Sequence, residues 1–351
     1  MVSMKFKVTW KAIILPVLGL LSFFVYLYLF NVDIPTIIAM VQQIDLTIYF
    51  FGIVLIMLEA FFFALSWRLL LDFLSVKLSV VKSFLYVWYG VFMDIIIPAE
   101  SISGEISRVY LVTREQDGTS GKVIASLVTH RLIGMGTNIT TLLIGISALL
   151  LRGRVSGDVL NLTLFLAIVT TISLVLLILL CVKEQWTLRI IDAVIRFVEY
   201  VSRRRWKLAK IRKNAFEVAR IFHDSMNEFV RAPKTLFASI FLHAIAWVFS
   251  LGVAYFVFLA MRYPVPWSVI IVTSSIVVAV KAVPLGVPFE IGLPEITMTT
   301  LYTLLGVPFD VSATATILTR ILTLWLRFFV GFVVQQWLEI QTIRQQQAQK
   351  T

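Results

Sequence analysis

Long runs of apolar residues dominate this sequence, and short polar connections separate them. Most runs approach the roughly 20 residues of helix that cross the apolar part of a bilayer. They do not alternate with a period of two, so the pattern does not favour a transmembrane β-barrel. Helices satisfy their own backbone hydrogen bonds inside a bilayer, so each run is predicted to be helical. The runs are Ala12–Phe30, Leu46–Trp67, Val80–Ile97, Leu132–Leu151, Val159–Val182, Leu236–Met261, Val269–Val283 and Leu318–Leu338.

The composition agrees with a membrane protein. Of the 351 residues, 59% are apolar and 15% are charged, whereas soluble domains carry about 25% charged residues. The single cysteine, Cys181, cannot form an internal disulfide and belongs to no metal-binding motif. We therefore expect an all-α integral membrane protein with about eight hydrophobic segments. Residues 1–351 would form one polytopic membrane domain, with no metal and no cofactor.

Residues 183–234 form a basic insert between the two halves of the chain, with 13 Lys and Arg against 6 Asp and Glu. Charged and apolar residues recur there at spacings of three and four, which predicts two amphipathic helices that separate at the basic run 203–207. Lys and Arg favour cytoplasmic loops and attract anionic headgroups. We expect a cytoplasmic helical hairpin that contacts such headgroups. No motif that reads nucleic-acid grooves accompanies the charge, so nucleic acid is not an expected partner.

The distribution of Lys and Arg among the loops predicts the topology. Basic residues in both terminal segments favour cytoplasmic N- and C-termini. Segments 80–97 and 269–283 then each begin and end on the same side of the membrane. One solution makes 80–113 and 269–306 re-entrant hairpins, the first entering from the cytoplasm and the second from outside. The alternative is eight full spans, with 105–113 and 295–305 as surface helices. We favour the hairpins.

One ordered set of residues occurs twice. Pro98 precedes Glu105 by seven residues, and Arg131 follows; in the second half Pro288, Glu295 and Arg320 have nearly the same spacing. The two copies would lie on opposite sides of the membrane, which is typical of an inverted repeat built from interrupted helices. Both arginines are interpreted as opening long apolar helices.

A buried charge in a bilayer costs at least about 2.5–3.5 kcal/mol, so these groups are expected to pair or to face water. The predicted pairs are Glu105 with Arg131 and Glu295 with Arg320. Each pair could simply fix a hairpin to its neighbour. Alternatively, the broken segments meet near the midplane and line a polar path, where an arginine and the helix N-termini after Pro98 and Pro288 could hold a phosphate.

These residues resemble a known family. Pro98, Gly104, Glu105 and Arg108, followed by Ala125 and Arg131, resemble the first conserved block of the lysyl-phosphatidylglycerol synthase/flippase transmembrane family, whose members are mostly uncharacterised (UPF-type) multi-pass proteins. The string Pro-x-Gly-x-Pro-x-Glu-x-Gly-x-Pro-Glu at 284–295, with Arg320, resembles the second. The resemblance covers about residues 12–340 and implies a plasma-membrane location, cytoplasmic termini and lipid translocation between leaflets.

Two departures limit what the resemblance implies. Ala99, Glu100 and Ser101 stand where many members have a glycine-rich string. The soluble aminoacyl-transferase domain of the synthase members is not found in this chain, so lysyl transfer is not assigned.

The expected function is a flippase-like translocase for a lipid or lipid-linked amphiphile, and not an enzyme. The alternatives are a membrane enzyme acting on lipid-linked substrates and a non-catalytic membrane scaffold. Membrane lipids or lipid-linked substrates are the expected partners, and a homo-oligomer is left open. The candidate substrate-binding residues are Glu105, Arg131, Glu295, Arg320, Asp94, Glu59, Glu290 and Arg327.

Overall fold

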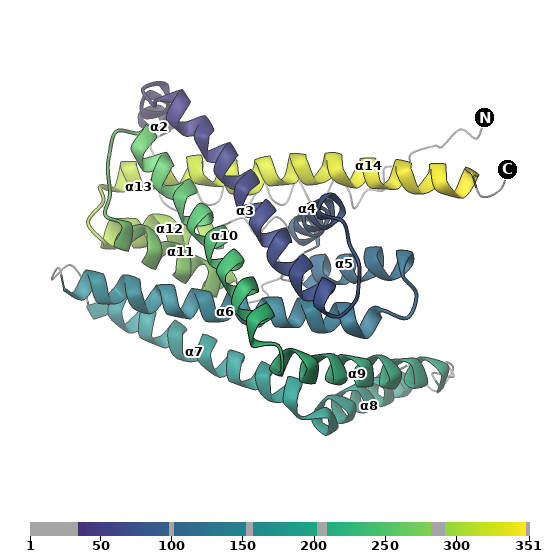
Figure 1. The fold of residues 1–351 in the computed structure, drawn as a ribbon. Helices are drawn as coiled ribbons and strands as arrows, with labels where there is room; N and C mark the ends of the chain where they lie inside the picture. The colour runs from purple at the N-terminus through teal and green to yellow at the C-terminus, as the bar shows by residue number, and fades with distance from the viewer. Residues whose placement is uncertain (1–33, 98–101, 152–156, 202–208, 282–291, 349–351) are drawn as a thin grey trace.

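The computed structural model describes residues 34–97, 102–151, 157–201, 209–281 and 292–348, and within these ranges the regular structure is entirely helical (Figure 1). The predicted segment Ala12–Phe30 lies outside the described residues. The helices are α2 (Ile34–Gln42), α3 (Leu46–Phe73), α4 (Val80–Ile96), α5 (Ile102–Glu115), α6 (Ser120–Leu150), α7 (Gly157–Val182), α8 (Glu184–Val201), α9 (Ala209–Val230), α10 (Pro233–Ala260), α11 (Trp267–Lys281), α12 (Leu293–Leu304), α13 (Phe309–Arg320), the π-helix η2 (Ile321–Leu326) and α14 (Arg327–Ala348).

Within the described residues, five helical stretches are long and apolar enough to cross a membrane. They are α3, α6, α7, α10 and the continuous stretch Phe309–Gln341 that joins α13, η2 and the first part of α14. Each covers a predicted apolar run to within one residue. This confirms the prediction of an all-α, multi-pass membrane protein.

Two of these helices begin earlier than predicted, so the prediction that Arg131 and Arg320 open their helices is wrong. Arg131 lies inside α6, and Arg320 lies within the last spanning stretch. The residues before each arginine are small or carry hydroxyl groups, which lowered the apolar signal. Such hydroxyls bond to backbone carbonyls of the same helix, as Thr314 Oγ1 does to Asp310 O at 2.7 Å. These segments are therefore helical and buried despite their polarity.

The long helices α3 and α10 pack against each other in opposite directions. Phe51 lies against Phe256 near one end, with ring centroids 5.0 Å apart, and near the other end Ser66 Oγ donates to Ser239 O at 2.9 Å. The first contact joins the start of α3 to the end of α10 and the second joins the end of α3 to the start of α10, so the two helices are antiparallel. A large apolar core lies beside them, and it includes Ile56, Phe258, Ile276, Tyr302 and Leu318.

Helices α4 and α5 form an antiparallel pair. Tyr86, early in α4, donates to Glu115 at the end of α5 at 2.6 Å, whereas Asp94, late in α4, accepts the Gly104 N–H near the start of α5 at 2.6 Å. At 17 residues, α4 is shorter than the ~20 residues of a full span. This length favours the re-entrant interpretation, although the connection at 98–101 lies outside the described residues.

In the second half of the chain, α11 is also too short for a full span and packs against the helix that follows it, α12. Helix α11 has 15 residues, and α12 in turn packs against α13. Glu295, Met298 and Tyr302 of α12 are buried. The burial of one face of α12 favours the hairpin over the alternative that placed 295–305 as a surface helix. The connection at 282–291 lies outside the described residues, and full re-entrance stays a prediction.

The two short helix pairs lie toward opposite ends of the bundle. Figure 1 shows α5 and α6 joined at the end that carries α8 and α9, whereas α12 and α13 are joined at the opposite end. The predicted inverted arrangement requires such a placement. The repeat itself remains a prediction.

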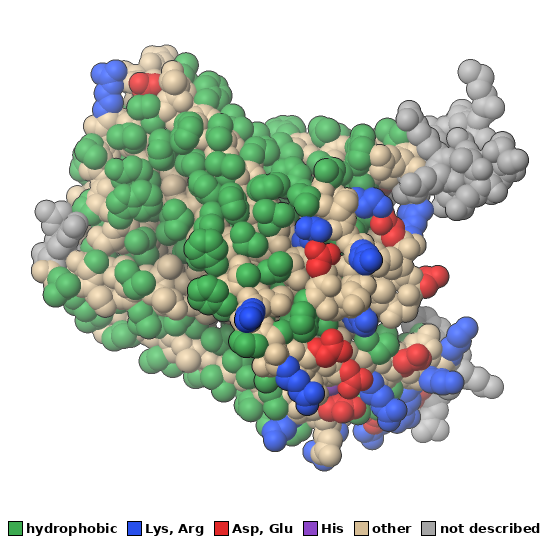
Figure 2. Space-filling model, viewed as in Figure 1, with side chains coloured by type: hydrophobic (Ala, Val, Ile, Leu, Met, Phe, Trp, Pro, Cys, Tyr) green, Lys and Arg blue, Asp and Glu red, His purple; other side chains and the backbone are tan. Residues whose placement is uncertain are grey.

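The surface divides into an apolar part and a charged end. On the face drawn in Figure 2, apolar side chains cover most of the surface, and most of the charged side chains gather at the end with α8 and α9. Helix α7 exposes Phe165, Ile168 and Ile172, which suits contact with lipid tails. In α8, Ile195 is buried but Ile190 and Val194 are exposed, so the predicted apolar face of this helix is only partly covered.

The basic insert folds as the two helices that its periodicity predicts, α8 and α9. They pack against each other, and Asp192 of α8 forms ion pairs with Arg196 and with Arg212 of α9. The basic run at 203–207 lies outside the described residues. The cytoplasmic location of this insert stays a prediction.

Candidate functional site

A cavity of about 420 Å³ lies in the helix bundle, and its wall is formed by residues of α3, α4, α5, α6, α10, α11 and the last spanning stretch. Apolar side chains such as Ile56, Val91 and Leu324 form part of its wall. The charged side chains on its wall are Glu59, Asp94, Glu105, Arg108, Arg131, Lys281, Arg320 and Arg327. A mixed wall of this kind can hold a molecule with both a polar and an apolar part.

The first predicted pair is present at this cavity. Arg131 Nη1 of α6 lies 3.5 Å from Glu105 Oε2 of α5. Both side chains are partly buried, at 32% and 19% exposed. The pair links the α4–α5 hairpin to a long helix, and both residues contribute to the cavity wall.

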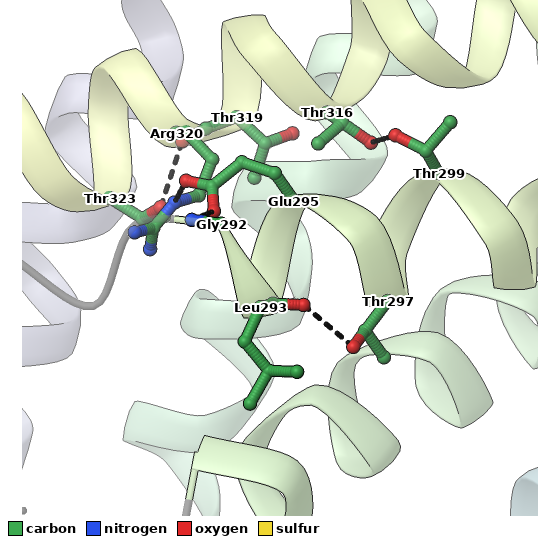
Figure 3. Close-up of polar contacts among 9 residues, drawn as sticks. All are labelled: Gly292, Leu293, Glu295, Thr297, Thr299, Thr316, Thr319, Arg320 and Thr323. Carbon is green, nitrogen blue, oxygen red and sulfur yellow. Dashed lines mark hydrogen bonds and ion pairs between the residues drawn. The ribbon is translucent and has the colours of Figure 1, made fainter. Parts of the chain in front are cut away.

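The second predicted pair is more deeply buried. Arg320 Nε donates to Glu295 Oε1 at 2.5 Å, and the same carboxylate accepts the Gly292 N–H through Oε2 at 2.7 Å. Figure 3 shows Arg320 reaching from the last spanning stretch toward Glu295 at the start of α12. Arg320 lines the cavity, whereas Glu295 lies behind it and is 1% exposed.

Hydroxyl groups hold α12 against α13 beside this pair. Thr299 Oγ1 donates to Thr316 Oγ1 at 3.1 Å (Figure 3). Gly292 begins α12 with φ at +102°, a value that residues with a side chain rarely adopt. This backbone turn lets the Glu295 carboxylate fold back onto the Gly292 amide, so one side chain both caps α12 and pairs with Arg320.

A third ion pair joins the cavity, between Glu59 of α3 and Arg327 at the start of α14. Both residues are among the candidate substrate-binding residues that the sequence predicts. The sequence analysis did not pair them, because 268 residues separate them along the chain. Their contact connects the second predicted apolar run to the last one.

Asp94 lines the cavity and also fixes the hairpin. Its Oδ1 accepts the Gly104 N–H at 2.6 Å and the Ser103 hydroxyl at 2.8 Å, so it caps the start of α5 from a neighbouring helix. At Gly104 a carboxylate therefore takes one of the backbone N–H groups that the expected phosphate would use. Likewise, Glu295 occupies the start of α12. Carboxylates favour these positions because the helix dipole is positive there.

Close approach of α4 and α5 depends on two glycines. A Cβ on Gly104 would lie 2.4 Å from Asp94 Oδ2 and 2.5 Å from Gly90 O. A Cβ on Gly90 would lie 3.2 Å from Arg108 Nε. The Gly104–Glu105 dipeptide therefore combines a close helix contact with a cavity-facing carboxylate.

Sequence reasoning did not assign a role at the site to Arg108, which lies one helical turn after Glu105 and is 7% exposed. The spacing of three from Glu105 could have indicated this position. Sequence reasoning also missed His243 of α10, whose Nδ1 lies 3.3 Å from His130 Nε2 of α6. Both histidines line the cavity. No spacing in the sequence connects them, because they are 113 residues apart.

The π-helix η2 was also not predicted. It occupies Ile321–Leu326, between Arg320 and Arg327. A π-turn holds more residues than an α-turn, so it changes the angular offset between the two arginines, and such segments are frequent at functional sites. Here Arg320 binds a carboxylate of α12, whereas Arg327 binds one of α3. Glu290, the remaining candidate, lies outside the described residues.

Comparisons with known proteins place this chain in a family. A UPF0104 membrane protein of Pyrococcus horikoshii is 20% identical over 301 residues, which are 85% of this chain and 89% of that protein. No solved structure matches the chain. The family described as the lysylphosphatidylglycerol synthase TM region matches residues 13–331, and the chain therefore belongs to this family of multi-pass membrane proteins.

Proposed function

We propose that this protein moves a lipid or lipid-linked amphiphile between the leaflets of the plasma membrane, with both termini in the cytoplasm. The observation that carries the proposal is the cavity of about 420 Å³, which combines apolar walls with ion pairs from helices far apart in the chain. An amphiphile needs both kinds of surface to cross a bilayer. The proposal is for a transporter and not for an enzyme.

The ion pairs give the cavity a means of accepting a polar headgroup. Paired charges are tolerated at bilayer depth because each neutralises the other. A headgroup can then exchange places with one partner without leaving a bare charge in an apolar environment. Glu105 and Arg131 suit this role, because both line the cavity and their charged groups lie 3.5 Å apart. They are also less buried than Glu295 and Arg320.

Leaflet exchange in proteoliposomes tests the proposal. The purified protein is reconstituted with fluorescent phospholipids, and dithionite measures the fraction that becomes accessible from outside. Wild type is expected to exchange lipid faster than empty vesicles, and Glu105→Gln is expected to be slower by about tenfold, equivalent to roughly 1.4 kcal/mol. Asp117→Asn, on an exposed residue of the turn that follows the same helix, is the matched control. Equal exchange in wild type and empty vesicles contradicts the proposal for those lipids.

The exposed and basic parts of α8 and α9 are proposed to contact anionic headgroups on the cytoplasmic surface. Trp186 of α8 is exposed and lies four residues after Val182, the last residue of α7. It supports this proposal, because tryptophan favours the membrane interface. The rate of lipid exchange between leaflets, measured in proteoliposomes with and without phosphatidylglycerol, tests this contact. Neutralising Arg189 and Arg196 is expected to remove any dependence on the anionic lipid, while an unchanged dependence contradicts it.

A further inference from the structure

Arginines are the most numerous charged side chains among the described residues of the cavity wall. Among the described residues that line it, five are basic and three are acidic, and Glu295 adds one carboxylate through its contact with Arg320. Three arginines are paired with carboxylates, as described above. The remaining arginine, Arg108, forms no ion pair with any described carboxylate within 4 Å.

Arg108 is buried with part of its hydrogen-bonding capacity unused. Its Nε lies 3.4 Å from Gly104 O, the carbonyl one turn earlier in α5. Its Nη1 is fully buried and has no hydrogen-bond partner among the described residues. A buried donor of a charged group that lacks a partner is costly, so its retention beside a cavity needs a physical reason.

Two aromatic rings of α3 fix the position of this guanidinium. The guanidinium carbon lies 5.3 Å from the ring centroid of Trp67 and 5.9 Å from that of Phe63. Trp67 is itself held by α6, because its Nε1 donates to Ser126 Oγ at 3.1 Å. Aromatic faces stabilise a cation without using its N–H groups. The rings therefore hold Arg108 in place and leave Nη1 available.

The groups around Arg108 leave its guanidinium without a direct carboxylate contact among the described residues. The histidine pair His130–His243 lies on the same cavity wall, and the Phe63 ring contacts both the pair and the guanidinium. The nearest carboxylates are already committed, because Asp94 caps α5 and Glu105 pairs with Arg131. A cationic headgroup would be repelled by the Arg108 guanidinium, whereas an anion would be attracted to it.

We infer that Arg108 is the anchoring residue for the phosphate group of the amphiphile that occupies this cavity. The inference rests on the proposed function and specifies the substrate class, a phosphate-bearing lipid rather than one recognised by its amine. A planar guanidinium binds phosphate oxygens through forked, charge-assisted hydrogen bonds. The free Nη1 provides one such donor, and the apolar wall receives part of the lipid tail.

Lipid binding to the purified full-length protein tests this inference separately from transport. Native mass spectrometry compares phosphatidylglycerol, diacylglycerol, which lacks the phosphate, and inorganic phosphate alone. Arg108→Gln is expected to weaken phosphatidylglycerol binding by about tenfold or more, which is ~1.4 kcal/mol, and to leave diacylglycerol binding unchanged. Arg114→Gln, on an exposed arginine of the same helix, is the matched control and should bind like wild type.

A folding defect is distinguished by a second variant. Arg108→Lys keeps the positive charge but lacks the planar guanidinium with its forked N–H donors. This variant is therefore expected to bind phosphatidylglycerol more tightly than Arg108→Gln and less tightly than wild type. Unchanged phosphatidylglycerol binding in Arg108→Gln overturns the inference. Equal weakening of diacylglycerol binding also overturns it, since Arg108 would then support the fold alone.

Two further outcomes, from phosphate binding and from leaflet exchange, separate this inference from the proposed function. Arg108-dependent binding of inorganic phosphate as strong as that of phosphatidylglycerol assigns the site to free phosphate and overturns the lipid substrate. Phosphatidylglycerol binding that depends on Arg108 without any leaflet exchange supports the anchor and contradicts the translocase.

Discussion

Arg320 and Glu295 are joined by a 2.5 Å hydrogen bond at a site where both side chains are almost completely buried. The same carboxylate caps α12 through the Gly292 amide. One side chain therefore fixes the start of a short buried helix and neutralises an arginine on the last spanning stretch. The second half of the cavity wall depends on this contact.

Removing one partner of this pair is expected to destabilise the protein strongly. Glu295→Gln or Arg320→Gln leaves a buried charge without its partner, which costs about 3–5 kcal/mol. The double variant removes both charges and is expected to be more stable than either single variant. Thermal unfolding in detergent, followed by tryptophan fluorescence, measures the effect. Strictly additive losses in the double variant would show that the two groups are not coupled.

Glu59 and Arg327 permit a charge-swap test, because the two residues pair directly and are less buried than Glu295 and Arg320. Glu59→Arg or Arg327→Glu alone places like charges beside each other, and leaflet exchange is expected to fall by about tenfold. The double swap restores opposite charges and is expected to recover most of the exchange. If the double swap is no better than the single variants, the pair does not act through its charge.

The contact of α4 with α5 leads to a packing prediction. Gly104→Ala places a methyl group against Asp94 and Gly90 O, so the hairpin must open and the free energy of unfolding should fall by about 1–3 kcal/mol. Gly136→Ala in α6 is the control, because its Cβ would meet no atom within 4 Å. That variant is expected to be as stable as wild type or slightly more stable. Equal thermal stability of both variants would contradict the tight contact.

The inverted arrangement predicts opposite exposure for two turns. In a Cys181→Ser background, Asp117→Cys reports the α5–α6 turn and Pro308→Cys reports the α12–α13 turn, and both native residues are exposed. A membrane-impermeant maleimide is expected to label the cysteine at 308 in whole cells and the cysteine at 117 only after lysis. Labelling of both from the same side contradicts the inverted repeat and the two hairpins.

The sequence predicted the helical membrane fold and two of the ion pairs for physical reasons. Apolar runs such as Val159–Val182 need only their composition to indicate a span, and α7 covers that range. The pairs Glu105–Arg131 and Glu295–Arg320 could be predicted because charges are costly in a bilayer and because proline, glutamate and arginine occur twice in the same order. These inferences depend on local composition and spacing, which a sequence displays directly.

Other parts of the site depend on contacts that the sequence does not display. Glu59 meets Arg327 only after the second and last predicted runs pack together, and His130 meets His243 in the same way. The role of Asp94 as a cap for α5 follows from the antiparallel packing of two short helices. The availability of Arg108 Nη1 depends on which neighbouring carboxylates are already engaged. Side-chain geometry in three dimensions decides each of these features.

Transport by this protein requires that an amphiphile enter the cavity between the ion pairs. Photo-crosslinking with a phospholipid that carries a diazirine near its headgroup, in proteoliposomes, tests it most directly when peptide mass spectrometry locates the adducts. If the amphiphile enters the cavity, adducts are expected on cavity residues such as Val91, Met135 and Leu324, and unlabelled phosphatidylglycerol is expected to compete for them. Adducts confined to outward-facing residues such as Phe165 and Ile172 of α7, with none on the cavity wall, would contradict it.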